Sequence, residues 1–137
     1  MDRLSKDARS ERMGRIKGKD TVPEMIVRRL VHSMGRRFRL HRSDLPGKPD
    51  LVFPGSRKVI FVHGCFWHRH PDSACKLARL PKSRLDFWLP KLERNRDRDV
   101  ENQENLRRLG WSVLVIWECE LKDMASVKDK IEAFLST

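Results

Sequence analysis

Residues 64–75 bring together side chains that bind metal ions. This segment contains two cysteines and two histidines, and a third cysteine, Cys119, lies far downstream. Three thiols and one imidazole supply the four ligands of a closed structural zinc site. The spacing C-x4-H-x4-C is looser than a zinc-finger signature, so free thiols and a buried Cys119 are the alternative. His68 and His70 compete for the histidine position, and the predicted ligands are Cys65, His70, Cys75 and Cys119.

A second set of residues suits a harder cation and proton transfer. Asp50 begins one predicted strand, and His63 follows the end of the next. Two strands joined by a short turn place these ends side by side, where a carboxylate and a main-chain carbonyl can hold Mg²⁺ against a scissile phosphate. His63 and His68 could orient or deprotonate the attacking water. The alternatives are a turn role for Asp50, structural histidines, and a purely helix-capping Glu24.

Aromatic residues lie among basic ones in two places. Phe66-Trp67 belongs to the cysteine-containing loop, and Phe87-Trp88 lies in a helical segment, with lysines and arginines around both pairs. Exposed aromatic side chains in a basic field can stack on bases or wedge between them. For Trp88, packing against the protein interior is an equal alternative. Trp111 and Trp117 are predicted to be core residues.

The elements that must position these side chains form an α/β pattern. Thr21 is a predicted N-cap for a helix that ends at Gly35, and Glu24 completes a capping box. The pattern then predicts an extended segment over 37–40, strands over 50–53, 58–62 and 111–117, a helix over 83–109 with a possible break near Asn95, and a helix over 126–135 capped by Ser126. This order predicts an α/β sandwich around a small mixed sheet.

Composition favours a single domain that binds a polyanion. The chain has 137 residues, with 30 Lys+Arg against 19 Asp+Glu and a net charge of +11, which favours nucleic acid over a membrane surface. No run of eighteen apolar residues or signal peptide is recognisable. Three cysteines, an odd number, argue against a disulfide framework and for a reducing, intracellular compartment. Residues 1–19 are polar and basic, and are expected to order on a partner.

Several motifs together resemble the very short patch repair (Vsr) DNA mismatch endonucleases. The resemblance runs in order from about Arg9 to Cys119 and is most specific in the segment FVHGCFWH. Its other parts are Pro49-Asp50, Phe87-Trp88 and Trp117-Glu118-Cys119. The family implies a restriction-endonuclease-like core with a structural zinc site. It also implies Mg²⁺-dependent nicking of one strand on the 5′ side of the thymine in a T:G mismatch.

The resemblance also implies roles for individual residues. Asp50 corresponds to the Mg²⁺-binding aspartate, and Val62 stands where the family often has threonine and offers its main-chain carbonyl. His68 corresponds to the principal catalytic histidine, with His63 and Glu24 as supporting residues around the hydrated cation. Cys65, His70, Cys75 and Cys119 resemble the zinc ligands. Phe66, Trp67 and Trp88 correspond to aromatics wedged beside the mispair, and Met13 and Ile16 to an arm that crosses the other groove.

The expected setting follows from this assignment. The partner is double-stranded DNA with a T:G mismatch, bound by a monomer in the cytoplasm at the bacterial nucleoid, with accessory repair proteins as further candidates. Two other functions remain open: a non-catalytic, zinc-stabilised DNA-binding protein, and a restriction-type endonuclease that cuts matched duplex. A zinc deaminase is disfavoured because the sequence has no H-x-E before the cysteines and no C-x-x-C pair.

Overall fold

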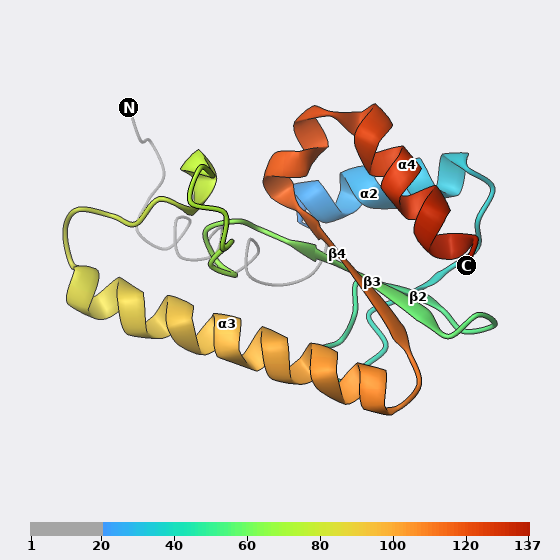
Figure 1. Cartoon of the computed structure of the whole chain (residues 1–137), viewed down its shortest axis with the longest axis horizontal. Coiled ribbons are helices and arrows are strands. Elements are labelled where there is room, and N and C mark those ends of the chain that lie inside the picture. The colour runs from blue at the N-terminus through green and yellow to red at the C-terminus, as the bar shows by residue number, and fades with distance from the viewer. Residues whose placement is uncertain (1–20) are drawn as a thin grey trace, which may run out of the picture.

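A computed structural model describes residues 21–137 of the chain (Figure 1). The predicted basic arm over residues 1–19, with Met13 and Ile16, lies outside these described residues. The described part has four short strands and three α-helices, each helix at least 12 residues long. Loops and two short 3-10 turns join them. None of the helices described is long and apolar enough to span a bilayer.

Helix α2, Val22–Ser33, begins as the sequence predicts. Thr21 is extended, and its side-chain oxygen accepts a hydrogen bond from the Glu24 N–H at 3.3 Å, which satisfies one of the free donors of the first turn. Val27 and Val31, four positions apart on one face, are completely buried. Glu24 is buried on the same helix, so its carboxylate points into the protein and not toward solvent.

The sheet has four strands in the order β1-β2-β3-β4 and is mixed, as predicted. β1 pairs with β2 and β2 with β3 in antiparallel fashion, whereas β3 and β4 are parallel. All six residues of β3 are buried, which fits its continuous apolar sequence. The bounds are β1 Arg39–Leu40, β2 Leu51–Phe53, β3 Lys58–His63 and β4 Ser112–Trp117.

The long helix α3, Leu85–Arg108, connects the cysteine-containing loop to β4. It runs without interruption, so the possible break near Asn95 is wrong. Asn95 instead donates a side-chain hydrogen bond to the main-chain carbonyl of Trp67 at 3.1 Å, which ties the loop to the middle of the helix. A helix 24 residues long extends about 36 Å, so α3 reaches well beyond the sheet (Figure 1).

Helix α4, Met124–Leu135, begins two residues earlier than predicted. Its cap is Asp123, whose carboxylate accepts the Ser126 N–H at 3.2 Å, and not Ser126 itself. The predicted Ser126 cap is therefore wrong; aspartate and serine are similarly good acceptors at this position, so residue type does not separate them. A short 3-10 helix, η2 (Glu118–Lys122), connects β4 to this helix.

Two apolar cores lie on opposite faces of the sheet. Helices α2 and α4 cover one face, and α3 covers the other (Figure 1). The residues of β3 alternate between the two cores, as the period of a strand requires. Ile60 and Val62 face α2 and α4, whereas Val59 and Phe61 belong to the core on the α3 side. The predicted α/β sandwich around a mixed sheet is therefore confirmed.

Candidate active site and metal centres

Three groups of candidate metal-binding side chains lie near the C-terminal end of β3. One contacts the main chain of Val62, the second includes His63, and the third begins at Cys65. In the described residues these are the sets of at least three cysteine, histidine, aspartate or glutamate side chains whose donor atoms all lie within 4.8 Å of one another. We name them the carboxylate cluster (Glu24, His41, Asp50), the histidine cluster (His63, His68, Asp99) and the thiol cluster (Cys65, His70, Cys75, Cys119).

The carboxylate cluster forms just before the first residue of β2. The last β2–β3 pair joins Leu51 to Ile60, so the ladder offers the Val62 N–H no strand partner on that side. Asp50 Oδ2 accepts this N–H at 2.7 Å, and the contact fixes its carboxylate at the end of β3. Asp50 and the end of β3 therefore meet, as the strand order predicts. The contact observed for Val62 is through its N–H, and the role of its carbonyl stays a prediction.

Glu24 and His41 complete this cluster from two other elements. His41 Nε2 lies 2.8 Å from Glu24 Oε2 and 3.8 Å from Asp50 Oδ1. Glu24 also forms an ion pair with Arg28, one turn further along α2. The Glu24 main-chain N–H therefore belongs to the cap of α2, whereas its carboxylate contacts His41, which also lies near Asp50.

Burial gives this cluster an unfavourable charge balance. Glu24 is 1% exposed, and burial raises the pKa of Asp50 to about 8. The Val62 N–H opposes this rise, whereas the neighbouring Glu24 carboxylate adds to it. Two carboxylates held together away from water are stabilised by a cation between them. The carboxylate cluster therefore has the donors and the charge that a divalent cation needs.

The histidine cluster lies on the other side of the end of β3. The rings of His63 and His68 stack in parallel with centroids 3.9 Å apart, and His68 Nδ1 lies 2.6 Å from Asp99 Oδ2. An aspartate at Nδ1 favours the tautomer with a proton there, which leaves Nε2 able to accept a proton. Asp99 comes from α3, so this contact joins the loop to the long helix.

His63 is the buried wall of this cluster. It is 3% exposed, and its ring lies against Phe61, His68 and the edge of Trp117. Burial, together with the charge of a protonated His68, lowers the pKa of His63 to about 2. His63 is therefore neutral at physiological pH, and it holds the His68 ring by stacking. Trp117 is half-buried among histidines and belongs to neither core cluster, unlike Trp111, which is a core residue as predicted.

The thiol cluster joins the loop after β3 to the end of β4. The His70 N–H donates to the Cys65 carbonyl at 2.9 Å, and the Cys119 N–H donates to Cys65 Sγ at 3.4 Å. Cys119 Sγ lies 3.6 Å from His70 Nδ1, and the Trp117 ring stacks on His70. Cys65 is fully buried, which raises the pKa of its thiol. A buried thiolate needs a compensating cation, and four donors so close together fit a tetrahedral zinc ion.

The structure separates the two histidines that compete for the thiol cluster. His70 lies with the three cysteines, whereas His68 faces Asp99 and His63. The main chain at Arg69, between them, has a φ of 55°, in the left-handed region that few non-glycine residues adopt. This turn sends the two imidazoles in different directions, which strict spacing rules do not predict.

The aromatic residues gather between the loop and the start of α3. Phe66 contacts Trp67 and Trp88 at ring distances of 5.0 and 5.5 Å, and Trp67 and Trp88 are 5.9 Å apart. Phe87 packs against Trp88 at 5.1 Å, is 46% exposed, and has the Arg84 guanidinium over its ring. All four lie outside the two core clusters. We call Phe66, Trp67, Phe87 and Trp88 the aromatic cluster.

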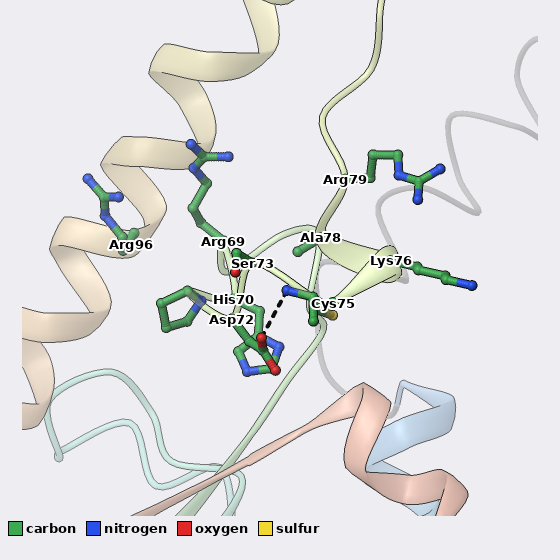
Figure 2. Close-up of a pocket in the computed structure, with 11 residues that line it drawn as sticks. Arg69, His70, Asp72, Ser73, Cys75, Lys76, Ala78, Arg79 and Arg96 are labelled. Carbon is green, nitrogen blue, oxygen red and sulfur yellow. Dashed lines mark hydrogen bonds between the residues drawn. The ribbon is translucent and has the colours of Figure 1, made fainter.

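A basic pocket of about 400 Å³ opens beside the thiol cluster (Figure 2). Its lining includes Arg69, His70, Cys75 and Arg96. Asp72 also lines it, and its carboxylate accepts the Ala74 N–H at 2.9 Å, which helps to hold the turn. Neither the carboxylate cluster nor His68 lines this pocket. Its charge suits phosphate oxygens, but it is not the place where the candidate catalytic groups meet.

Two members of these clusters were not predicted from the sequence. His41 follows a two-residue strand, and Asp99 lies in the middle of a helix among many charged residues. Asp99 stands 31 positions from His68, so neither spacing nor a local motif connects them. For His41 a signal does exist: it is one of only five histidines, and it precedes the turn that leads to Asp50.

Comparisons with known proteins identify a family and several relatives of this chain. A protein-family model described as "DNA mismatch endonuclease Vsr" matches residues 1–75. The type II nicking enzyme V.XorIIP of Xanthomonas oryzae pv. oryzae is 52% identical over 134 residues, covering 98% of this chain and 96% of that protein. The type II nicking enzyme V.NmeAIP of Neisseria meningitidis is 39% identical, over 95% of this chain and 91% of that protein.

A further relative, named as a DNA mismatch endonuclease, matches nearly as much of the chain as the two nicking enzymes do. The DNA mismatch endonuclease Vsr of Escherichia coli is 41% identical over 125 residues, covering 91% of this chain and 78% of that protein. The matched family model spans more than half of this chain and includes the segment FVHGCFWH. The chain therefore belongs to the Vsr family of DNA endonucleases, hydrolases that act on DNA.

Proposed function

We propose that this protein is a Mg²⁺-dependent endonuclease that nicks one DNA strand on the 5′ side of the thymine in a T:G mismatch. The observation that carries the proposal is that the carboxylate and histidine clusters both lie at the C-terminal end of β3. Phosphodiester hydrolysis needs a cation near the phosphate and a base near the water. Asp50 contacts the main chain of Val62 and His68 stacks on His63, so these two candidate groups touch consecutive residues.

The carboxylate cluster is the proposed cation site. Asp50 and Glu24 offer the oxygen donors that Mg²⁺ prefers, and the Val62 carbonyl is a further candidate. The raised pKa of Asp50 supports this choice, because a buried carboxylate beside another one gains from a bound cation. When bound, the cation would supply Lewis-acid stabilisation of the negative charge that develops on the scissile phosphate.

His68 is the proposed base of the reaction. Its Nδ1 is held by Asp99, which leaves Nε2 to take a proton from the attacking water. Stacking on neutral His63 fixes the plane of the ring, so that Nε2 keeps one direction. Asp99 and His63 therefore act as positioning residues, and His68 as the residue that moves the proton.

The thiol cluster is the proposed structural zinc site. The loop over 64–84 has only one short 3-10 turn, η1 (Lys76–Ala78), between β3 and α3. A tetrahedral ion held by Cys65, His70, Cys75 and Cys119 would pin this loop to the end of β4. Pinning matters for function because the same loop carries His68, Phe66 and Trp67.

The aromatic cluster is the proposed contact with the mismatch. Phe66, Trp67 and Trp88 lie together, the Arg84 guanidinium lies over the ring of the neighbouring Phe87, and the net charge of +11 favours DNA. Wedging aromatic side chains between bases costs a few kcal/mol of stacking energy per step. A T:G wobble pair lowers that cost, so deformability contributes to mismatch preference. Two relatives are named type II nicking enzymes, which supports the proposed cutting of a single strand.

We further infer a diverged restriction-endonuclease-like core and one functional domain over residues 1–137. The arm over residues 1–19, with Met13 and Ile16, would reach the other groove of the DNA. We expect the protein to act as a monomer in the bacterial cytoplasm, with accessory repair proteins as candidate partners. These inferences rest on the family and on the basic sequence of the arm.

One assay tests the proposed function against both alternatives. A 5′-labelled duplex with a single T:G mismatch and its matched T:A counterpart are incubated with the full chain and Mg²⁺, with and without a chelator. We expect a nick in the thymine strand of the mismatched duplex alone, and none with chelator. Cutting of both strands of matched DNA would show a restriction-type enzyme. Tight mismatch binding without cutting under any divalent cation would show a non-catalytic binding protein.

A further inference from the structure

His41 is a member of the carboxylate cluster that the expected Mg²⁺ ligands do not include. Its side chain is 19% exposed, and its Nε2 is buried between two carboxylates, 2.8 Å from Glu24 Oε2 and 3.8 Å from Asp50 Oδ1. Despite these short distances, Nε2 has no well-aligned hydrogen bond to any described residue. A ring nitrogen close to two carboxylates, yet not aligned to donate to them, is arranged like a ligand that shares a cation with them.

The sheet register explains why His41 reaches this place. β1 and β2 pair Arg39 with Val52 and Leu40 with Leu51. His41 and Asp50 are the next residues beyond this ladder, so the chain leaves both strands with these two residues close to each other. Their side-chain donor atoms, His41 Nε2 and Asp50 Oδ1, lie 3.8 Å apart, close enough for one cation to contact both.

The backbone of His41 is also unusual. Its φ is 45°, in the left-handed region, where non-glycine residues are uncommon and where functional sites are over-represented. This conformation ends β1 and turns the chain toward the loop over residues 42–49. The same turn leaves the imidazole beside Glu24 and Asp50 rather than in solvent.

We propose that His41 is the third protein ligand of the catalytic cation, and that its imidazole widens the cations accepted at this site from Mg²⁺ to Mn²⁺. The inference rests on the proposed function, because it takes the carboxylate cluster as the cation site. Mg²⁺ strongly prefers oxygen donors, whereas imidazole suits the transition metals. A site with two carboxylates and one imidazole therefore binds Mn²⁺ more tightly than a site with oxygen donors alone.

The test compares His41→Gln with the control His32→Gln. His32 is an exposed histidine in the last turn of α2 and belongs to none of the three clusters. Glutamine keeps an oxygen donor near the site, so Mg²⁺ binding should survive. Each full-length variant is first given one equivalent of zinc to fill the thiol cluster. Mn²⁺ and Mg²⁺ affinities are then measured by titration calorimetry, and bound Mn²⁺ is examined by pulsed electron paramagnetic resonance for coupling to ¹⁴N.

We expect ¹⁴N coupling in the wild type and in His32→Gln, and its loss in His41→Gln. Mn²⁺ affinity should fall by about tenfold or more in His41→Gln, with Mg²⁺ affinity changed by less than about threefold. Unchanged coupling and affinities would overturn the proposal. An equal fall for both cations would also overturn it, because His41 would then only position Glu24.

Asp50→Asn separates this inference from the proposed function. Loss of Mn²⁺ and Mg²⁺ binding in Asp50→Asn, together with unchanged ¹⁴N coupling in His41→Gln, would refute the role of His41 alone. Full retention of both cations in Asp50→Asn would move the cation site elsewhere and refute the proposed function as well.

Discussion

The thiol cluster and the carboxylate cluster flank the same strand end, yet they are built in opposite ways. Three of the four thiol-cluster residues lie within eleven positions of one loop, and Cys119 arrives from β4. The carboxylate cluster takes one residue each from α2, from the turn after β1 and from the position just before β2. The first therefore holds a poorly structured loop in place, whereas the second is held in place by the sheet and a helix.

This difference predicts how each cluster responds to mutation. Removing a thiol ligand should release the loop and lower stability, because the proposed zinc ion would supply much of the order there. Removing a carboxylate should leave the fold intact, since it relieves repulsion between buried like charges. Substitutions in the thiol cluster should therefore lower stability, whereas substitutions in the carboxylate cluster should lower activity, although both clusters lie near the end of β3.

The largest expected effect is on chemistry. Asp50→Asn should lower the nicking rate by more than about 10³-fold, because the variant loses the charge that holds the cation. Mismatch binding, measured by fluorescence anisotropy, should stay within about threefold of the wild type. Asp44→Asn is the matched control, since Asp44 is exposed and pairs only with Arg42 among the described residues. Equal loss of binding and nicking would assign Asp50 to folding instead.

The next effect should be on stability. Cys119→Ser should release zinc and lower the free energy of unfolding by about 3 kcal/mol or more, because one ligand is lost from a closed site. Zinc content is measured by atomic emission and stability by urea denaturation. A chelator strong enough to strip zinc from the wild type should give a similar loss. A full equivalent of zinc in the purified variant would contradict the assignment of Cys119.

A smaller effect is expected in the histidine cluster. His68→Gln should reduce nicking by about 10²-fold, as the loss of a general base does. Asp99→Asn should cost less, because it removes the negative charge beside Nδ1 and leaves the imidazole in place. Single-turnover rates at saturating enzyme measure both. A wild-type nicking rate in His68→Gln would show that His68 is not the general base.

The smallest effect should come from the aromatic cluster, which belongs to neither metal site. Trp67→Ala should weaken binding to the T:G duplex by about tenfold, equivalent to roughly 1 to 2 kcal/mol of lost stacking. Binding to the matched duplex should change less, because that duplex resists insertion of the ring. Leu109→Ala, an exposed apolar position at the end of α3, is the control. Equal weakening for both duplexes would make Trp67 a general DNA contact.

The contrast between the clusters also explains which parts could be predicted from the sequence. The strands, the start of α2 and the mixed sheet follow from hydrophobic periodicity and capping residues, which act locally. The predicted break near Asn95 was wrong because the polarity of a local segment does not show distant contacts. The polar side chain of Asn95 holds the loop through its hydrogen bond to Trp67. The prediction of Ser126 as the cap of α4 was wrong because aspartate and serine are both common N-caps, and the sequence alone does not distinguish Asp123 from Ser126.

Local chemistry in the sequence determined that this chain has a basic character, a soft donor set and an aspartate beside a buried strand, since these are properties of residue type and spacing. Spacing alone left His68 and His70 in competition for the thiol cluster, and the tertiary structure confirmed the choice of His70, because a left-handed turn at Arg69 separates the two imidazoles. It also brought His41 and Asp99 to the ends of β2 and β3. Strand register and helix placement act over tens of residues, so no local pattern records them.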